Sequence, residues 1–182
     1  MSKSDCSTYA VSLSFDASFS SSLSSLVQSF ARVTGNRTLL EKNAPVHLTL
    51  GMFHVPDGKI LELKRLFEEF CASVKKGSTL DFCSTDSFKQ KVIFLSIDKA
   101  SSSFEMLKKL NAHLHDLFLP HFEAGANRNY LPEVFFPHVA LAVKLSPEQF
   151  EKGINWAHPP ASAEIQAVSL ARCHPYEEIA RH

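Results

Sequence analysis

The spacing of apolar residues switches between that of a strand and that of a helix along the whole chain, which restricts the fold to a mixed one. From Tyr9 to Phe15 apolar side chains alternate with small or polar ones, and this predicts a half-buried strand. From Phe19 to Phe30 they recur at helical spacing, and Gly35 supplies a stop. The predicted strands are 9–15, 46–55, 79–83, 91–97, 136–145 and 163–171, and the predicted helices are 19–30, 63–74, 103–118 and a short one that opens at 146–148.

The order of these elements is β-α-β-α-β-β-α-β-α-β. Helices connect most of the strands, and a hairpin with its turn at 86–90 connects two of them. This combination favours an α+β fold, with helices packed over antiparallel or mixed sheets. No stretch has the composition of a linker, so residues 1–182 are predicted to form a single domain.

The balance of charge argues against one class of partner. The chain has 19 Lys and Arg residues against 19 Asp and Glu residues, so its formal net charge is zero. Without an overall basic field, a protein that coats long duplex nucleic acid is not expected. A nucleotide or an RNA end would have to be held locally, in a cleft.

The compartment can be predicted from the N-terminus and the cysteines. Residues 1–8 contain no apolar core of the signal-peptide kind, and no apolar run approaches the length of a membrane span. The four cysteines are scattered without a Cys-x-x-Cys spacing. We therefore expect a cytoplasmic protein with reduced thiols and no membrane partner.

Two predicted strands carry the same short pattern around a histidine. The first reads PVHLTL over residues 45–50 and the second reads PHVAL over residues 137–141, half a chain apart, which suggests an internal duplication. Side chains alternate along a strand, so each histidine is expected on the face opposite the apolar core. That face is predicted to carry His47, Thr49, Gly51 and Phe53 in one strand, and His138, Ala140, Ala142 and Lys144 in the other.

A facing pair of imidazoles suits the cleavage of a phosphodiester. One group must take a proton from water while another gives a proton to the leaving oxygen, and histidine does either near pH 7. Two close imidazoles also disfavour double protonation, so one tends to be neutral while the other is charged. Thr49 would place a hydroxyl beside His47 to bind a phosphate oxygen.

These motifs resemble those of the two-histidine (2H) phosphoesterase superfamily, which includes bacterial 2′–5′ RNA ligases and cyclic nucleotide phosphodiesterases. His47-Leu-Thr49-Leu matches the family's His-x-Thr/Ser-x motif, and His138-Val-Ala140-Leu matches it except at the hydroxyl. The resemblance implies a bilobed, pseudo-symmetric fold of two antiparallel or mixed sheets flanked by helices around a central cleft. It also implies that His47 and His138 are catalytic, with His47 the acid and His138 the base by analogy.

For activity, the resemblance implies a monomeric phosphoesterase that needs no metal or cofactor. Its substrate would be a nucleotide or RNA end with a 2′,3′-cyclic phosphate, and the diester could be hydrolysed or formed. Ala140 departs from the motif and leaves three alternatives open. Another donor stands in for the hydroxyl, or the enzyme is slow, or the cleft binds nucleotides without turnover. The candidate replacement donors are Arg128, Tyr130, Lys91 and Lys144.

Other residues have two interpretations each. Phe53 is a candidate for stacking on a base and equally for core packing. Arg128 and Tyr130 lie in a predicted loop before the second motif, where they either reach over a substrate or are simply solvated. Histidines 113, 115 and 121 suggest a metal-dependent hydrolase, but positions 113 and 115 of a helix point about 200° apart, so no metal site is predicted there.

Overall fold

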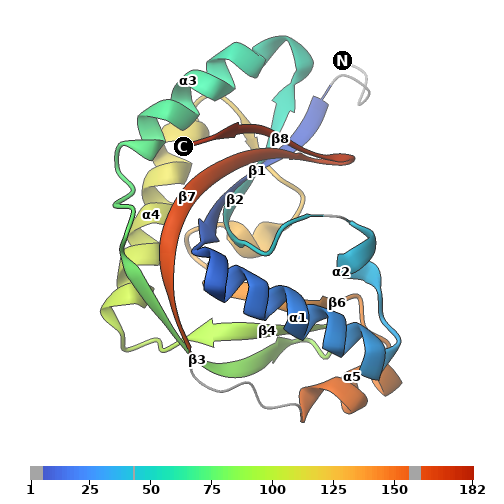
Figure 1. Cartoon of the computed structure of the whole chain (residues 1–182). Coiled ribbons are helices and arrows are strands. Elements are labelled where there is room, and N and C mark those ends of the chain that lie inside the picture. Colours follow the sequence, from blue (N-terminus) through green and yellow to red (C-terminus); the bar gives the residue numbers. More distant parts are fainter. Residues whose placement is uncertain (1–5, 43, 156–160) are drawn as a thin grey trace.

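The computed structural model describes residues 6–42, 44–155 and 161–182. Within these ranges the strands form one eight-stranded antiparallel sheet in the order β5-β2-β1-β7-β3-β4-β6, with β8 paired to β7 (Figure 1). The strands are β1 (Cys6–Phe15), β2 (Leu48–Pro56), β3 (Thr79–Phe88), β4 (Val92–Ile97), β5 (Glu123–Ala124), β6 (His138–Val143), β7 (Ala161–Cys173) and β8 (Tyr176–Arg181). The helices are α1 (Ala17–Thr34), α2 (Thr38–Glu41), α3 (Ile60–Cys71), α4 (Ser102–Phe118) and α5 (Pro147–Ile154), with short 3₁₀ turns η1 (Asp57–Lys59) and η2 (Arg128–Tyr130).

The long strand β7 joins the two halves of the molecule. Its first residues, Ala161–Glu164, pair with β3, and the stretch from Ile165 to Arg172 pairs with β1. Figure 1 shows β7 bending as it passes from one half to the other. The α+β class is confirmed, and the two predicted sheets are the two ends of one continuous path. This arrangement leaves β2 near one end of the path and β6 at the other.

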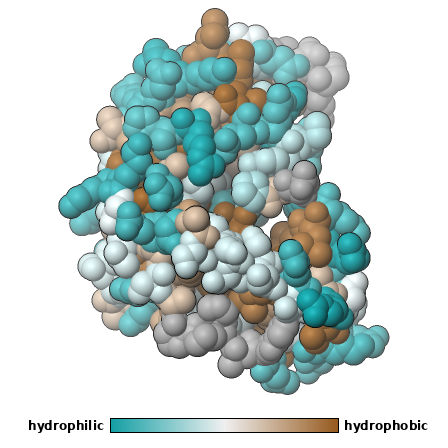
Figure 2. Space-filling view, in the orientation of Figure 1, coloured by the Kyte–Doolittle hydropathy of each residue, from teal (hydrophilic) through white to brown (hydrophobic). Residues whose placement is uncertain are grey.

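Each half of the sheet is covered by a helix that follows a strand of the opposite half. Helix α1 follows β1 but packs on β6 and α5, whereas α4 follows β4 but packs on β2 and α3. Most core residues lie on the apolar faces of the helices and of the strands that they cover, and these residues form one hydrophobic cluster. The face of the molecule seen in Figure 2 is largely hydrophilic, with hydrophobic residues in separate patches. None of the helices in the described ranges is long and apolar enough to cross a membrane.

The helix ends follow from local sequence. Asp16 caps α1 by accepting a hydrogen bond from Phe19 N at 2.9 Å, and Gly35 ends that helix in the left-handed region with φ of 73°. Ser146 and Gln149 form a capping box that opens α5. The strand β8 lies in a tail that showed no clear pattern, because its burial alternates weakly.

Candidate active site

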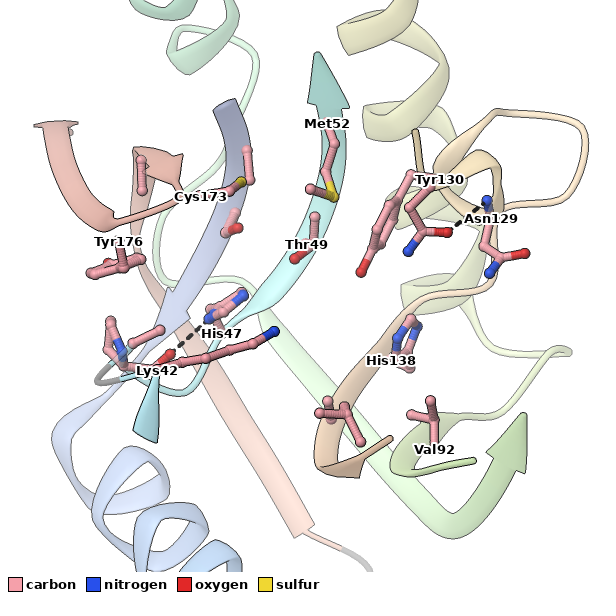
Figure 3. A pocket seen from close by; sticks show the side chains of 18 of the residues that line it. Lys42, His47, Thr49, Met52, Val92, Asn129, Tyr130, His138, Cys173 and Tyr176 are labelled. Atoms are coloured by element: carbon pink, nitrogen blue, oxygen red, sulfur yellow. Dashed lines mark hydrogen bonds between the residues drawn. The ribbon is translucent and has the colours of Figure 1, made fainter. Parts of the chain in front are cut away.

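The structure brings His47 and His138, the two histidines of the repeated motif, to one cavity. His47 lies just before β2, and His138 is the first residue of β6. Both line a cavity of about 560 Å³, a size typical of small-molecule sites. Figure 3 shows the two rings on opposite walls of this cavity, with open space between them.

The histidine pair also lines a second, smaller cavity. This cavity has a volume of about 410 Å³ and extends towards α1 and α2. The two cavities share His47, His138, Thr49 and Tyr130. The pair therefore stands where the two cavities overlap.

Each of the two imidazoles is held by the same kind of hydrogen bond, from its Nδ1 to the backbone carbonyl two residues earlier. His47 Nδ1 lies 2.7 Å from Pro45 O, and His138 Nδ1 lies 2.8 Å from Phe136 O. A carbonyl oxygen can only accept, so Nδ1 carries the hydrogen in both rings. Nε2 is then the nitrogen left to exchange a proton in each ring. A carbonyl two residues back thus fixes the tautomer that proton transfer requires.

Burial lowers the pKa of both imidazoles below the ordinary value of 6.5. The rings of Phe88 and Phe94 pack beside His138, edge-on and tilted, with their centroids 5.0 Å from that of the imidazole. The hydrogen bond to the backbone carbonyl partly offsets burial in each ring. The positive charge of Lys42 lowers the pKa of His47 further, and that of His47 does the same for His138. The neutral form is favoured in both, and a second proton is harder to add than the first.

A bulge in β2 changes which side chains face the cavity. Val11 pairs with Gly51 but the next residue, Ser12, pairs with Thr49, so Leu50 is an extra residue in β2. Alternation reverses there. Thr49 faces the cavity as expected, but the next residue to do so is Met52.

The predicted position of Phe53 was therefore wrong. Its side chain is fully buried, with its ring 4.8 Å from that of Phe118 and 5.2 Å from that of His115. Phe53 is a core residue and cannot stack on a base. The sequence did not reveal the bulge, because a run of apolar residues such as LGMF fits either phase of alternation.

The same bulge occurs in β6. Phe94 pairs with Ala140 and Ile93 with Ala142, so Leu141 is the extra residue. As a result Ala142 is buried and Val143 faces the cavity, the reverse of the predicted order. Ala140 lines the cavity, where it presents a methyl group in place of a hydroxyl.

Close packing of α4 on β2 surrounds the first bulge. A Cβ added at Gly51 would lie 2.9 Å from Leu114 Cδ2 and 3.1 Å from His115 Cε1, so glycine allows this approach. Asn111, fully buried on the same helix, donates from Nδ2 to Leu50 O at 2.6 Å and to Tyr130 O at 2.8 Å. It thereby ties the bulge to η2. Sequence reasoning missed Asn111, although an amide within the apolar stripe of a predicted helix was a usable sign.

Tyr130 lies between the two motif strands. Its ring is parallel to that of His138, at 8° and a centroid distance of 6.3 Å. Burial raises the pKa of its hydroxyl, and a hydrogen bond with Thr49 opposes this. In Figure 3 the hydroxyl points into the cavity towards Thr49. Tyr130 therefore stays protonated and presents a donor close to both motifs.

The remaining candidates separate into two groups. Lys91 and Lys144 line the cavity, together with Lys42 and Lys89, which sequence reasoning did not select. Arg128 is exposed and is not among the residues that line the cavity. Lys42 and Lys89 are found only from the structure, because surface lysines are common and nothing in the sequence marks these two as lining a cavity.

The three histidines considered for a metal point to different neighbours. His115 is buried and its Nδ1 donates to Asn111 O at 2.8 Å, whereas His121 pairs with Glu62 at 2.7 Å. His113 lies near Phe70, with ring centroids 6.0 Å apart. Across the part of the chain that the structure describes, no three His, Cys, Asp or Glu side chains are grouped to hold a metal ion.

Comparisons with known proteins extend these observations. The sequence model of the 2′-5′ RNA ligase superfamily matches residues 20–176. The apo structure of E. coli LigT superposes with a TM-score of 0.60 at 17% identity, covering 98% of both chains. E. coli LigT complexed with 3′-AMP gives 0.62 at 16% identity with the same coverage. At such identities the likeness to these structures shows the fold. A comparison with curated protein sequences gives no significant match.

Proposed function

We propose that this chain, which belongs to the 2′–5′ RNA ligase superfamily, is a metal-independent phosphoesterase that uses His47 and His138 as general acid and base. One observation carries the proposal. Both imidazoles line one cavity, and each donates Nδ1–H to the carbonyl two residues earlier, so Nε2 remains for proton exchange. A purely structural role would not require two histidines that are far apart in the sequence to share this arrangement.

The substrate class that fits best is a nucleotide or RNA end with a 2′,3′-cyclic phosphate. Neutral His138 takes a proton from water at Nε2 as the water oxygen bonds to phosphorus. The bond from phosphorus to one ribose oxygen breaks, and that oxygen takes the Nε2 proton of charged His47. The product is a phosphate monoester, and proton exchange with solvent restores the pair. Diester formation would use the same groups with a ribose hydroxyl in place of water.

The assignment of acid and base follows the superfamily by analogy. The positive charge of one imidazole lowers the pKa of the other, so the two rings take up protons one after the other. We assign His47 as the charged acid and His138 as the neutral base. Both roles are filled at once at a pH between the two pKa values of the pair.

Tyr130 is proposed to replace the hydroxyl that Ala140 lacks. The ring stacks parallel to His138, and the hydroxyl stays protonated because burial raises its pKa. Thr49 and Tyr130 would each donate to a non-bridging phosphate oxygen. Donors fixed in advance on developing charge are often the largest contribution to such catalysis.

The ligands bound in similar solved structures support a nucleotide ligand for this chain. E. coli LigT has been crystallised with 3′-AMP, NADP+ and ATP, which are nucleotides. We propose the same broad ligand class here, and a monomer in a reducing cytoplasm. All four cysteines are free, and the pKa of Cys71 and Cys173 is raised to about 11 by burial, as in unreactive thiols.

A binding protein without turnover is the second candidate, and Ala140 is the observation that favours it. Losing one donor in the transition state commonly costs about 10²–10³ in rate. If Tyr130 does not replace that donor, the cavity would still bind a nucleotide while hydrolysing it very slowly.

One assay separates these candidates. Purified protein is incubated with each of the four 2′,3′-cyclic nucleoside monophosphates in EDTA, and product formation is followed by chromatography. Turnover that survives EDTA and disappears in His47→Ala supports the phosphoesterase. Nucleotide binding without turnover supports the binding protein, and activity abolished by EDTA contradicts the proposed mechanism.

A further inference from the structure

The charges that line the large cavity are all of one sign. Among the described residues that line it, the charged side chains are Lys42, Lys89, Lys91, Lys144 and Arg172, and none is a carboxylate. The chain as a whole has no net charge. The cavity therefore concentrates positive charge well beyond what composition gives, which is typical of a site for an anion.

Three of these lysines gather at the end of the cavity formed by β3, β4 and β6. Lys89 lies in the turn between β3 and β4, and Lys91 O accepts a hydrogen bond from Leu145 N at 3.0 Å, which places it beside Lys144. Within the described ranges, the side chains of these three lysines have no ion-pair or hydrogen-bond partner. By contrast Arg172, at the other end, is paired with Glu177. The three lysines are charges available for a ligand.

Two of the three lysines are held in a conformation that lysine rarely adopts. Lys89 has φ of 49° and Lys144 has φ of 55°, both in the left-handed region. A side chain other than Gly, Asn or Asp is disfavoured there, and at Lys89 the tight hairpin turn between β3 and β4 imposes this conformation. Gln90, with φ of 54°, shares the turn but does not line the cavity. It provides an internal control.

The strand spacing separates the backbone of the lysines from that of His138. Lys144 lies six residues beyond His138, or about 15–20 Å between Cα atoms at the usual rise per strand residue. Flexible lysine stems shorten that separation, which leaves an anion on the order of 10 Å from the reacting phosphorus. A simple nucleoside 2′,3′-cyclic phosphate has no second anionic group to bind at this end.

We infer that Lys89, Lys91 and Lys144 form a second phosphate subsite, which binds a further phosphate of the same substrate. This inference rests on the proposed function only in assuming that the reacting phosphate lies between the histidines. The further phosphate belongs either to the 5′ end of a mononucleotide or to the preceding linkage of an RNA chain. In both cases the protein prefers substrates with two phosphates to those with one.

Binding measurements test this without requiring turnover. The dissociation constants of adenosine 3′-monophosphate, adenosine 3′,5′-bisphosphate and the 3′-phosphorylated dinucleotide ApAp are measured by calorimetry. Wild type should bind one or both two-phosphate ligands more tightly than the monophosphate. Whichever is preferred identifies the source of the phosphate. The preference should fall about five- to tenfold in Lys89→Asn/Lys144→Asn, since two charged contacts are lost.

The choice of asparagine separates binding from folding. Asn tolerates the left-handed region, so the double variant should melt at the same temperature as wild type or higher while its preference falls. Gln90→Asn relieves strain in the same turn and should keep the preference, as should Lys75→Gln/Lys76→Gln, which removes two exposed charges outside the cavity. Lys91→Gln, in ordinary backbone, is a further variant should the double variant unfold.

The outcomes are distinct from those of the proposed function. Equal affinity of wild type for all three ligands, or a preference that survives in Lys89→Asn/Lys144→Asn or Lys91→Gln, overturns the subsite. If the lysine variants lose the preference as expected but the protein shows no turnover, the subsite is established and the proposed enzymatic function is wrong. If the protein turns over cyclic nucleotides but shows no preference for two phosphates, the enzymatic function stands and the subsite is wrong. His47→Ala should abolish turnover and still distinguish two phosphates from one.

Discussion

The half of the sheet that ends in β2 and the half that ends in β6 have the same backbone plan but different chemistry. Both have a histidine bound to the carbonyl two residues earlier, and both have a bulge three residues after it. In the first half Thr49 and Gly51 follow the histidine, and in the second Ala140 and Ala142 do. The shared elements set the tautomer and direction of each imidazole, whereas the hydroxyl two residues after the histidine is present in the first half and absent from the second.

Removal of either histidine should have the largest effect. We expect His47→Ala and His138→Ala each to reduce kcat by at least about 10³, because acid and base act in one step. The double variant should be little worse than either single variant. His113→Ala, an exposed histidine outside the cavity, is the control, and melting temperatures should change little in all four. Loss of folding in both active-site variants would mark the pair as structural.

The hydroxyl of Tyr130 should come next. Tyr130→Phe should lower kcat about 10²–10³-fold, as expected for a lost transition-state donor. Ala140→Thr should change the kcat of the wild type little, because Tyr130 already provides the hydroxyl donor that Ala140 lacks. In the Tyr130→Phe background, however, it should recover about tenfold by providing the hydroxyl from the strand. If Ala140→Thr instead accelerates the wild type strongly, Tyr130 is not the substitute donor.

The two bulges should respond differently to a methyl group. Gly51→Ala should destabilise the fold by about 1–3 kcal/mol, since the new Cβ would lie 2.9 Å from Leu114 Cδ2. The matched position in β6 already holds a methyl, so Ala142→Gly should cost only about 0.5–1 kcal/mol, mainly in backbone entropy. Urea unfolding measures both. Equal costs would mean that α4 packs on β2 no more closely than α1 packs on β6.

The smallest effect expected is on stability at mild acid pH. Burial lowers the pKa of His47 and His138 in the folded chain, so the unfolded chain binds more protons between that value and 6.5. Stability should therefore be constant above about pH 7 and fall as the pH drops from 6.5 through the folded pKa.

Urea titrations of wild type and His47→Gln/His138→Gln between pH 5 and pH 8 measure this. The wild type should lose more stability, and the dependence left in the variant should come mainly from His115, whose pKa burial also lowers. A variant with the same pH dependence as wild type would show that the pair is not desolvated.

The sequence predicts this site well up to the bulges and poorly after them. His47 and Thr49 precede the extra residue, so simple alternation places them on the cavity side. Phe53 follows it and was assigned to the wrong face. A bulge is set by pairing with another strand and by the packing of α4 at Gly51, neither of which a local pattern contains.

Other parts of the site depend on contacts between distant segments. Asn111 meets Leu50 and Tyr130 only after α4 has docked, and the lysines of the turn line the cavity only because β6 pairs with β4. The helices were easier to predict, because residues that mark their ends, such as Gly35 and Ser146, lie next to them in the sequence. Short or weakly alternating elements such as α2, β5 and β8 were not predicted.

The position of β7 in the sheet has a consequence for how the chain folds as it leaves the ribosome. Strand β7, at the centre of the sheet, follows every other strand except β8 along the chain. It pairs with β1 through residues that are far apart in the sequence, such as Tyr9 and Arg172. Until β7 emerges, β1 and β3 each expose an unpaired edge, which is a hazard for aggregation. A nascent chain that stops before Ala161 should therefore need a chaperone, and the sheet should close only late in synthesis.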